Sequence, residues 1–194
     1  MHALQSWNLP PGDYLEFGVY RGRSFIYAFK QARLRKLNMY FYAFDSFEGL
    51  PEVTGKDKDY SLYRKGDYAC DEGSFRQILA ANGVDLDAVT IVPGFYENTL
   101  NKETKKNLNI KRAAIVWIDC DIYESTKYVL DFITDYLTMG SFIIFDDWFC
   151  FGADPNAGEM RATREWLEKN PQIRLLEYHK FGVSGQSFIV QILK

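Results

Sequence analysis

Short apolar runs alternate along the chain with segments whose apolar positions recur at helical spacing. The runs predict strands at 14–18, 39–44, 89–92, 113–118 and 141–145. The helical spacing predicts helices at 24–36, 75–82, 129–137 and 161–169. Strands that alternate with helices usually form parallel sheets, and continuously apolar strands such as 113–118 are buried on both faces. The pattern therefore indicates an α/β fold with a mostly parallel central sheet.

The last two predicted strands, 174–178 and 187–193, are joined by a glycine-containing turn at 181–185. Because no helical segment separates them, we expect one of them to run antiparallel, as a hairpin at the edge of the sheet. Residues 51–73 break the regular alternation, since they are polar, charged and without clear periodicity. A connection of this length is usually functional or mobile. We expect a loop over the strand ends, with room for a helix within it.

The composition narrows the class of protein. Of the 194 residues, 47% are apolar and 25% are charged, as expected for one domain spanning 1–194. The net charge of −3 offers no basic excess for nucleic acid, and no apolar run approaches the roughly 20 residues of a membrane span. No secretory signal is evident, and the three cysteines lack the spacing of a disulfide framework or a zinc finger. We expect a cytoplasmic, enzyme-sized domain that binds neither nucleic acid nor a membrane.

In an open α/β sheet, ligands bind at the carboxyl ends of the strands. The first strand carries Glu16 and runs into a turn with Gly18 and Gly22. This turn lacks the middle glycine of a dinucleotide fingerprint, so a plain tight turn is the alternative interpretation. The second strand ends at Asp45, where a carboxylate commonly holds ribose hydroxyls, although a solvated strand end would look the same. Together the two features favour a nucleoside ligand.

Paired carboxylates follow the two most apolar strands. Asp119 and Asp121 come after the strand at 113–118, and Asp146 and Asp147 come after the next one. If the strands are neighbours, the acids converge and need a cation or protons, because like charges raise one another's pKa. Oxygen-only ligands favour Mg²⁺ first, with Mn²⁺ or Ca²⁺ as further options.

Both pairs also have a structural interpretation. Asp121 can cap the next helix, with Glu124 three residues later as the reciprocal partner of a capping box. Such a cap does not exclude a second role, since it also lies at the ligand edge of the sheet. Asp146 and Asp147 can simply begin a polar loop.

These motifs together resemble the macrocin O-methyltransferase family. Its members are class I, magnesium-dependent methyltransferases that use S-adenosylmethionine and act on sugar hydroxyls of natural products. The resemblance extends over about residues 12–170 and rests on five segments: 16–22, 44–51, 93–100, 119–126 and 140–147. It implies a Rossmann-like class I methyltransferase fold.

The resemblance also implies roles for individual residues. Glu16 and the turn from Gly18 to Gly22 would hold the methionine part of S-adenosylmethionine. Asp45 would bind the ribose with Ser46 beside it, and Ser24 would be a further cofactor-binding residue. The ligands of Mg²⁺ or Mn²⁺ would be Asp119, Asp146 and Asp147. Asp121 would be the catalytic base that takes the proton of the acceptor hydroxyl.

We therefore predict a metal-assisted O-methyltransferase that acts on a hydroxylated small molecule, a sugar or a sugar-bearing natural product. A nicotinamide-dependent oxidoreductase is disfavoured by the missing glycine and by carboxylates that hydride transfer does not need. A metal-dependent hydrolase would leave Glu16 and Asp45 unexplained. A non-catalytic cofactor-binding protein is supported only by the few residues that precede the first strand. The acceptor and the oligomeric state, including a homo-oligomer, are left open.

Overall fold

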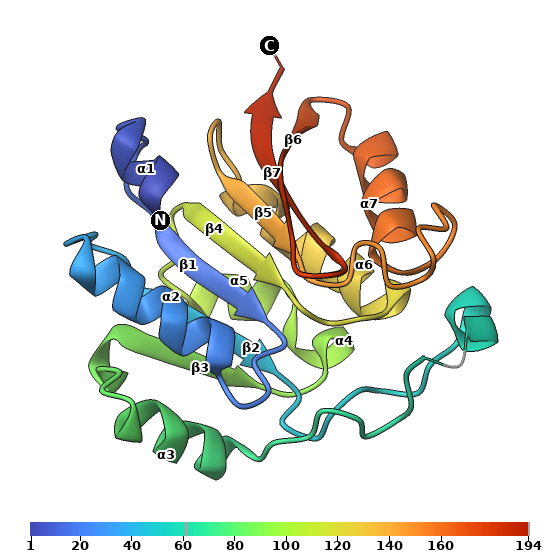
Figure 1. The fold of residues 1–194 in the computed structure, drawn as a ribbon, viewed down its shortest axis with the longest axis horizontal. Helices are drawn as coiled ribbons and strands as arrows, with labels where there is room; N and C mark the ends of the chain where they lie inside the picture. Colours follow the sequence, from blue (N-terminus) through green and yellow to red (C-terminus); the bar gives the residue numbers. More distant parts are fainter. Residues whose placement is uncertain (61, 194) are drawn as a thin grey trace.

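The computed structural model describes residues 1–60 and 62–193. Its centre is a seven-stranded sheet with the order β3-β2-β1-β4-β5-β7-β6 (Figure 1). The strands are β1 (Asp13–Phe17), β2 (Phe41–Asp45), β3 (Val89–Pro93), β4 (Ala113–Ile118), β5 (Phe142–Phe145), β6 (Ile173–Phe181) and β7 (Gly185–Ile192). Strands β1 to β5 are parallel, and β7 runs antiparallel to both β5 and β6. The predicted mostly parallel sheet with an antiparallel C-terminal hairpin is confirmed.

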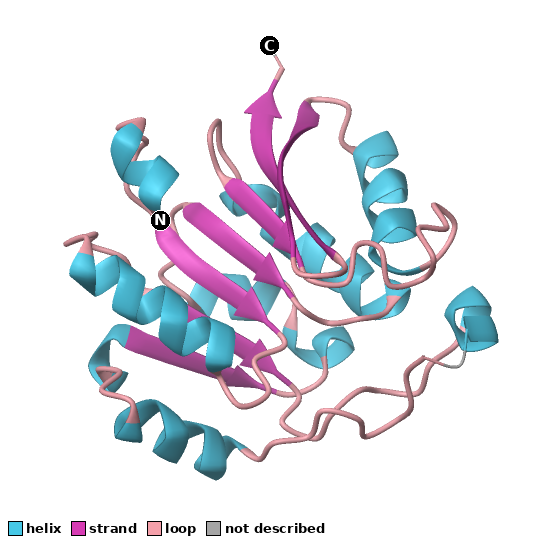
Figure 2. Cartoon of the chain, viewed as in Figure 1, coloured by secondary structure: helices cyan, strands magenta, loops and turns pink. Residues whose placement is uncertain are grey.

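Helices cover both faces of the sheet (Figure 2). One face carries α1 (His2–Ser6), α2 (Arg23–Leu34) and α3 (Glu72–Ala81), and the other carries α4 (Tyr96–Thr99), α5 (Lys102–Asn107), α6 (Tyr123–Ile133) and α7 (Gly158–Lys169). Strand side chains alternate between these layers, so Tyr14 packs with Phe25 of α2 while Phe17 packs with Phe132 of α6. Two buried cores result, one on each face. Within the described residues, no helix combines the length and the apolar character that a bilayer crossing requires.

Three predicted helices begin about a turn or more earlier than the sequence-based expectation, and the one predicted at 75–82 begins at Glu72, after the N-cap Asp71. The helix predicted at 129–137 begins at Tyr123 and ends at Ile133, and the 3₁₀ helix η3 (Thr134–Tyr136) continues it. The helix predicted at 161–169 begins one turn earlier, at Gly158. In α6 and α7, apolar periodicity does not mark the first turn, because that turn is held by Asp57, which is distant in sequence.

Most of the segment predicted as a loop over the strand ends, 51–73, forms an excursion that we call the strap, residues 50–60 and 62–68. Its two legs are joined at the base, where Leu50 donates to the carbonyl of Asp67 and Gly66 donates to the carbonyl of Leu50, each at 2.9 Å. Its tip contains the expected hidden helix, the 3₁₀ helix η1 (Gly55–Tyr60). In Figure 1 the two legs run side by side away from the sheet edge. The strap therefore has a closed base and a structured tip.

Asp57 attaches the tip of the strap to the amino ends of two helices. Its side chain is 4% exposed and accepts hydrogen bonds from the backbone N–H of Tyr123 in α6, at 2.6 Å, and of Gly158 in α7, at 3.0 Å. Helix amino ends carry unpaired N–H groups and a partial positive charge, so one buried carboxylate stabilises both. Two further hydrogen bonds join the same tip to Asp154. Its side chain accepts from Lys56 Nζ at 2.6 Å and from the Tyr60 hydroxyl at 2.7 Å.

We expect Asp57→Ala to destabilise the protein, because it removes the hydrogen-bond acceptor of two helix ends. The loss of a helix cap costs about 0.5–2 kcal/mol, so we expect about 2 kcal/mol in total and a fall in Tm of about 4–8 °C. Differential scanning calorimetry measures this change. Asp59→Ala is the matched control, since Asp59 lies in the same 3₁₀ helix and is exposed. Equal Tm values for the two variants would contradict the role of Asp57.

Candidate active site

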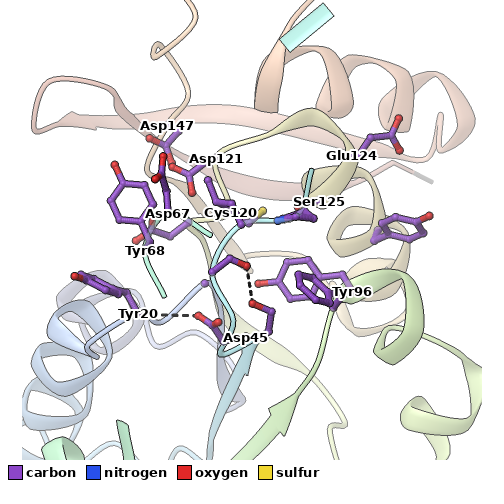
Figure 3. A pocket seen from close by; sticks show the side chains of 18 of the residues that line it. Tyr20, Asp45, Asp67, Tyr68, Tyr96, Cys120, Asp121, Glu124, Ser125 and Asp147 are labelled. Atoms are coloured by element: carbon purple, nitrogen blue, oxygen red, sulfur yellow. Dashed lines mark hydrogen bonds between the residues drawn. The ribbon is translucent and has the colours of Figure 1, made fainter. Parts of the chain in front are cut away.

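A cavity of about 800 Å³ lies at the carboxyl ends of the parallel strands (Figure 3). Its walls come from the ends of β1, β2, β4 and β5, from the start of α6 and from both legs of the strap. The predicted site residues that line it are Gly18, Asp45, Ser46, Asp119, Asp121, Asp146 and Asp147. The remaining predicted residues, Glu16, Gly22 and Ser24, are not among its lining residues.

The predicted metal ligands converge at this edge. Strands β4 and β5 are adjacent, as the argument from sequence required. Asp119, Asp146 and Asp147 each place one carboxylate oxygen so that all three oxygens lie within 4.8 Å of one another. Burial and then the neighbouring carboxylates raise the pKa of Asp119 well above its ordinary value, and burial and then Asp147 raise the pKa of Asp146 to about 6. Carboxylates this close together cannot all stay ionised unless a cation or protons neutralise them.

Asp147 has the most elaborate surroundings of the three. Its Oδ1 accepts a hydrogen bond from the Tyr63 hydroxyl at 3.1 Å and a weak one from the Cys150 thiol at 3.0 Å. Its backbone N–H donates to Glu159 Oε2 at 3.1 Å. Its Oδ2 is buried, and among the described residues it has no hydrogen-bond partner. One oxygen of Asp147 thus accepts hydrogen bonds within the protein, and the other accepts none from the described residues.

Glu159 is a site residue that the sequence reasoning missed. It lies in the first turn of α7 and is fully buried, so the pKa of its carboxyl is raised well above the ordinary value by burial and then by Asp147. Its carboxylate accepts the hydrogen bond of the Asp147 backbone N–H and so holds this part of the backbone in place. The available signal was an acidic residue soon after the Asp146–Asp147 pair. It was overlooked because α7 was predicted to begin at Arg161, two residues after it.

The capping-box interpretation of Asp121 is wrong. Asp121 has a φ of 65°, and the N-cap position of α6 falls on Ile122. The backbone N–H of Tyr123 in the first turn donates instead to Asp57 in the strap. Glu124 pairs with Lys127 on the helix surface at 2.5 Å and makes no reciprocal cap. Sequence spacing alone could not exclude the capping box, because the competing acceptor is 66 residues away along the chain.

Asp121 lies instead inside the carboxylate cluster. Its side chain is 7% exposed, lines the cavity and lies next to Asp147 (Figure 3). Burial raises the pKa of Asp121 well above its ordinary value, Asp147 raises it further, and a hydrogen bond from Tyr63 opposes the shift. Aspartate tolerates the left-handed backbone better than most residues, and such positions are common at functional sites.

Glycine is required at two positions of the first turn for different structural reasons. Gly18 has a φ of 84°, and a Cβ atom there would lie 1.7 Å from the carbonyl oxygen of Asp119. Only glycine lets the end of β1 pass this close to the carboxylate cluster. Gly22 has a φ of 72°, and its Cβ would lie 2.9 Å from the Phe75 ring of α3. The second glycine is therefore explained by helix packing, while the first brings the turn to the cavity.

Asp45 holds the same turn in place. Its Oδ2 accepts from the backbone N–H of Val19 at 2.7 Å and of Tyr20 at 3.2 Å, and its Oδ1 accepts from Phe47 at 2.8 Å (Figure 3). The carboxylate also lines the cavity. Asp45 therefore connects the ends of β1 and β2 and fixes the shape of one cavity wall.

Two tyrosines stand at the cavity wall in strained backbone conformations. Tyr20 has a φ of 43° and Tyr68 a φ of 60°, which bulky residues rarely adopt. Their rings meet edge to face with centroids 5.9 Å apart, and both rings remain partly exposed. The contact joins the turn after β1 to the strap at one side of the cavity (Figure 3).

Glu16 and Ser24 form a buried pair below the turn. Glu16 is fully buried and accepts hydrogen bonds from the Ser24 hydroxyl at 2.6 Å and from the Tyr14 hydroxyl. Burial raises the pKa of Glu16 to about 8, and the two hydrogen bonds only partly oppose this shift. Both carboxylate oxygens are occupied within the protein, so a contact of Glu16 or Ser24 with a cofactor stays a prediction.

Comparison with solved structures defines the class of fold. The chain is similar to the O-methyltransferase NovP, with a TM-score of 0.79 and 24% identity, over 97% of this chain and 75% of that one. It is also similar to CalS11, a calicheamicin methyltransferase, with a TM-score of 0.75 and 26% identity, over 95% of this chain and 74% of that one. The fold is the Rossmann-like class I methyltransferase fold.

Sequence comparison defines the family. The profile of the Macrocin-O-methyltransferase (TylF) family matches residues 6–170, and the chain belongs to this family. It is 34% identical over 146 residues to the 8-demethyl-8-(2,3-dimethoxy-alpha-L-rhamnosyl)-tetracenomycin-C 4'-O-methyltransferase of Streptomyces olivaceus, covering 71% of this chain and 53% of that protein. It is 29% identical over 153 residues to the mycinamicin III 3''-O-methyltransferase of Micromonospora griseorubida, covering 74% and 57%. The chain thus spans about half the length of the curated relatives it matches.

Glu16 is expected to make the stability of the ligand-free protein depend on pH. Its pKa of about 8 lies above the value of about 4.3 that glutamate has in an unfolded chain. The contribution of Glu16 to the free energy of unfolding is fully present below about pH 4, where its carboxyl is protonated. It is lost as the pH rises to about 8, at about 1.4 kcal/mol per unit of pKa difference. Glu16→Gln cannot ionise, so its Tm should fall less than that of the wild type between about pH 5 and pH 8. Calorimetry across this range is the measurement, and the exposed Glu168→Gln is the control. Identical slopes for wild type and Glu16→Gln would rule out the raised pKa.

Proposed function

We propose that this protein transfers a methyl group from S-adenosylmethionine to a hydroxyl of a small molecule, with a divalent cation at the site. The observation that carries the proposal is the presence of three converging carboxylates and the Gly18 turn in one cavity. The names of the relatives support a sugar or a sugar-bearing natural product as the acceptor, since two of them are O-methyltransferases of a rhamnosyl-tetracenomycin and of a mycinamicin.

The methyl donor would occupy the part of the cavity formed by Gly18, Asp45 and Ser46. Gly18 lets the backbone approach a ligand closely, and Asp45 supplies a carboxylate of the kind that binds ribose hydroxyls. Because Asp45 also holds the N–H groups of Val19 and Tyr20, a ribose bound to it would be fixed relative to the turn. Glu16 and Ser24 would act from below, by supporting this turn.

The divalent cation would be held by Asp119, Asp146 and Asp147. Two features fit it: the three oxygens within 4.8 Å of one another, and the buried Oδ2 of Asp147, which has no partner among the described residues. An all-oxygen donor set suits Mg²⁺ or Mn²⁺. When bound, such a cation would act as a Lewis acid that lowers the pKa of a nearby hydroxyl.

Asp121 would accept the proton of the acceptor hydroxyl. It lines the same cavity as the metal ligands and lies next to Asp147, where an acceptor hydroxyl near the cation would lose its proton. The strap residues Leu50, Thr54 and Tyr68 form the wall that faces this region, so they would contact the acceptor. The arrangement orients donor, acceptor and base within one cavity that the strap partly closes.

The alternative functions fit the site less well. A nicotinamide-dependent oxidoreductase has no use for a carboxylate cluster beside the turn. A metal-dependent hydrolase would use the cluster but leaves the Gly18 turn and Asp45 without a role. A non-catalytic cofactor-binding protein leaves Asp121 without a role, now that it is no helix cap.

Binding measurements test the proposal without knowledge of the acceptor. We expect S-adenosylhomocysteine to raise Tm, with about 2.7 kcal/mol of stabilisation at 100 times Kd.

Asp146→Asn should weaken Mn²⁺ binding at least about 10-fold in calorimetric titration, while S-adenosylhomocysteine still binds. Asp154→Asn is the control, because Asp154 follows the same strand but bonds to Lys56 and Tyr60. The proposal fails if millimolar S-adenosylhomocysteine leaves Tm unchanged.

The role of Asp121 requires a turnover assay. Asp121→Asn keeps the size of the side chain and tolerates the left-handed backbone, so Tm and the affinity for S-adenosylhomocysteine should stay close to wild type. Asparagine cannot accept the proton, so kcat should fall by about 10²-fold or more. Transfer of labelled methyl groups to a panel of hydroxylated sugars and glycosides provides the assay. Near-normal kcat on a genuine acceptor would refute the assignment.

A further inference from the structure

Tyr63 reaches the carboxylate cluster from outside the sheet. Its hydroxyl donates to Asp147 Oδ1 at 3.1 Å, although the two residues are 84 positions apart in the chain. The elements that follow the parallel strands supply the carboxylates, whereas this donor comes from the strap. The contact therefore exists only while the strap is seated.

The structure holds Tyr63 from several sides. Its ring packs on Phe151 with centroids 5.9 Å apart, and the neighbouring Tyr60 meets the same ring at 5.1 Å. Asp57 fixes the tip of the strap to α6 and α7, and the backbone pairing of the legs fixes its base. These contacts fix the position of the Tyr63 hydroxyl. A fixed hydroxyl can orient the carboxylate that accepts its hydrogen bond.

The two oxygens of Asp147 have different environments as a result. Oδ1 receives the hydroxyl of Tyr63 and the thiol of Cys150, while Oδ2 is buried and has no partner among the described residues. A carboxylate that binds a metal is usually oriented by hydrogen bonds to its other atoms, and those partners tune metal affinity. Tyr63 has the geometry of such a partner.

We propose that Tyr63 is a positioning residue, whose hydroxyl holds Asp147 Oδ1 so that Oδ2 is presented to the cation. This inference rests on the proposed function, because it requires Asp147 to bind a divalent cation. It makes the strap part of the metal site, so that seating of the strap and metal affinity are coupled.

The same strap offers a matched control. The Tyr60 hydroxyl donates to Asp154 at 2.7 Å, and its ring packs on Phe151 as that of Tyr63 does. Tyr60→Phe and Tyr63→Phe each remove one hydroxyl and one hydrogen bond to an aspartate while keeping the ring. Only the second change touches a predicted metal ligand.

The experiment measures the Kd of Mn²⁺ by calorimetric titration, in the presence of S-adenosylhomocysteine, for the wild type and both variants. We expect Tyr63→Phe to bind Mn²⁺ about 10-fold more weakly and Tyr60→Phe to match the wild type. The Kd of S-adenosylhomocysteine should be the same for all three proteins, and the two variants should have similar Tm values. This combination separates orientation of a ligand from general loosening of the strap.

Each other outcome overturns the inference. Equal Mn²⁺ affinity in Tyr63→Phe and wild type shows that the hydroxyl does not position Asp147. Equal weakening in both variants assigns the effect to the strap as a whole. A wild type that binds S-adenosylhomocysteine but no Mn²⁺ removes metal assistance and this inference together, whereas a wild type that binds neither contradicts the proposed function itself.

Discussion

Electrostatic repulsion among the carboxylates after β4 and β5 is the constraint on which the rest of the site depends. Asp119, Asp121, Asp146 and Asp147 crowd one partly buried edge, and burial and mutual repulsion raise the pKa of at least three of them. An arrangement of this kind costs folding free energy unless protons or a cation neutralise it. The fold contains this carboxylate cluster in spite of its cost, which is the physical reason to regard this edge as a binding site.

Contacts from other parts of the chain hold the cluster in place. Glu159 accepts the backbone N–H of Asp147, Tyr63 donates to its side chain, and Gly18 lets the end of β1 approach Asp119 without a clash. Asp57 uses a carboxylate in the opposite way, since its charge lies against two helix amino ends that stabilise it. Acidic side chains thus both create the site and secure the strap that covers it.

The predictable parts of the fold and the site were those encoded in neighbouring residues. The apolar run at 113–118 and the acids that follow it identify β4 and its ligand edge, because a strand buried on both faces has to be continuously apolar. The start of α6 was not predictable in this way. Spacing made Asp121 a plausible cap, but the acceptor that competes for this helix end, Asp57, lies in the strap. Glu159 was missed for a related reason, since the first turn of α7 carries no apolar periodicity.

The sequence by itself determined the strands, the α/β class with a mostly parallel sheet, the residues at each strand end and the resemblance to a methyltransferase family. These follow from local patterns, because the period of apolar side chains and the chemistry of a strand end need no knowledge of distant contacts. Only the tertiary structure decided which acids share a cavity, that Gly22 serves packing against Phe75 and that Glu16 lies beneath the turn. It also decided that a polar segment with no periodicity becomes a strap, because Asp57 and Tyr63 acquire their roles from N–H groups and a carboxylate that lie far along the chain.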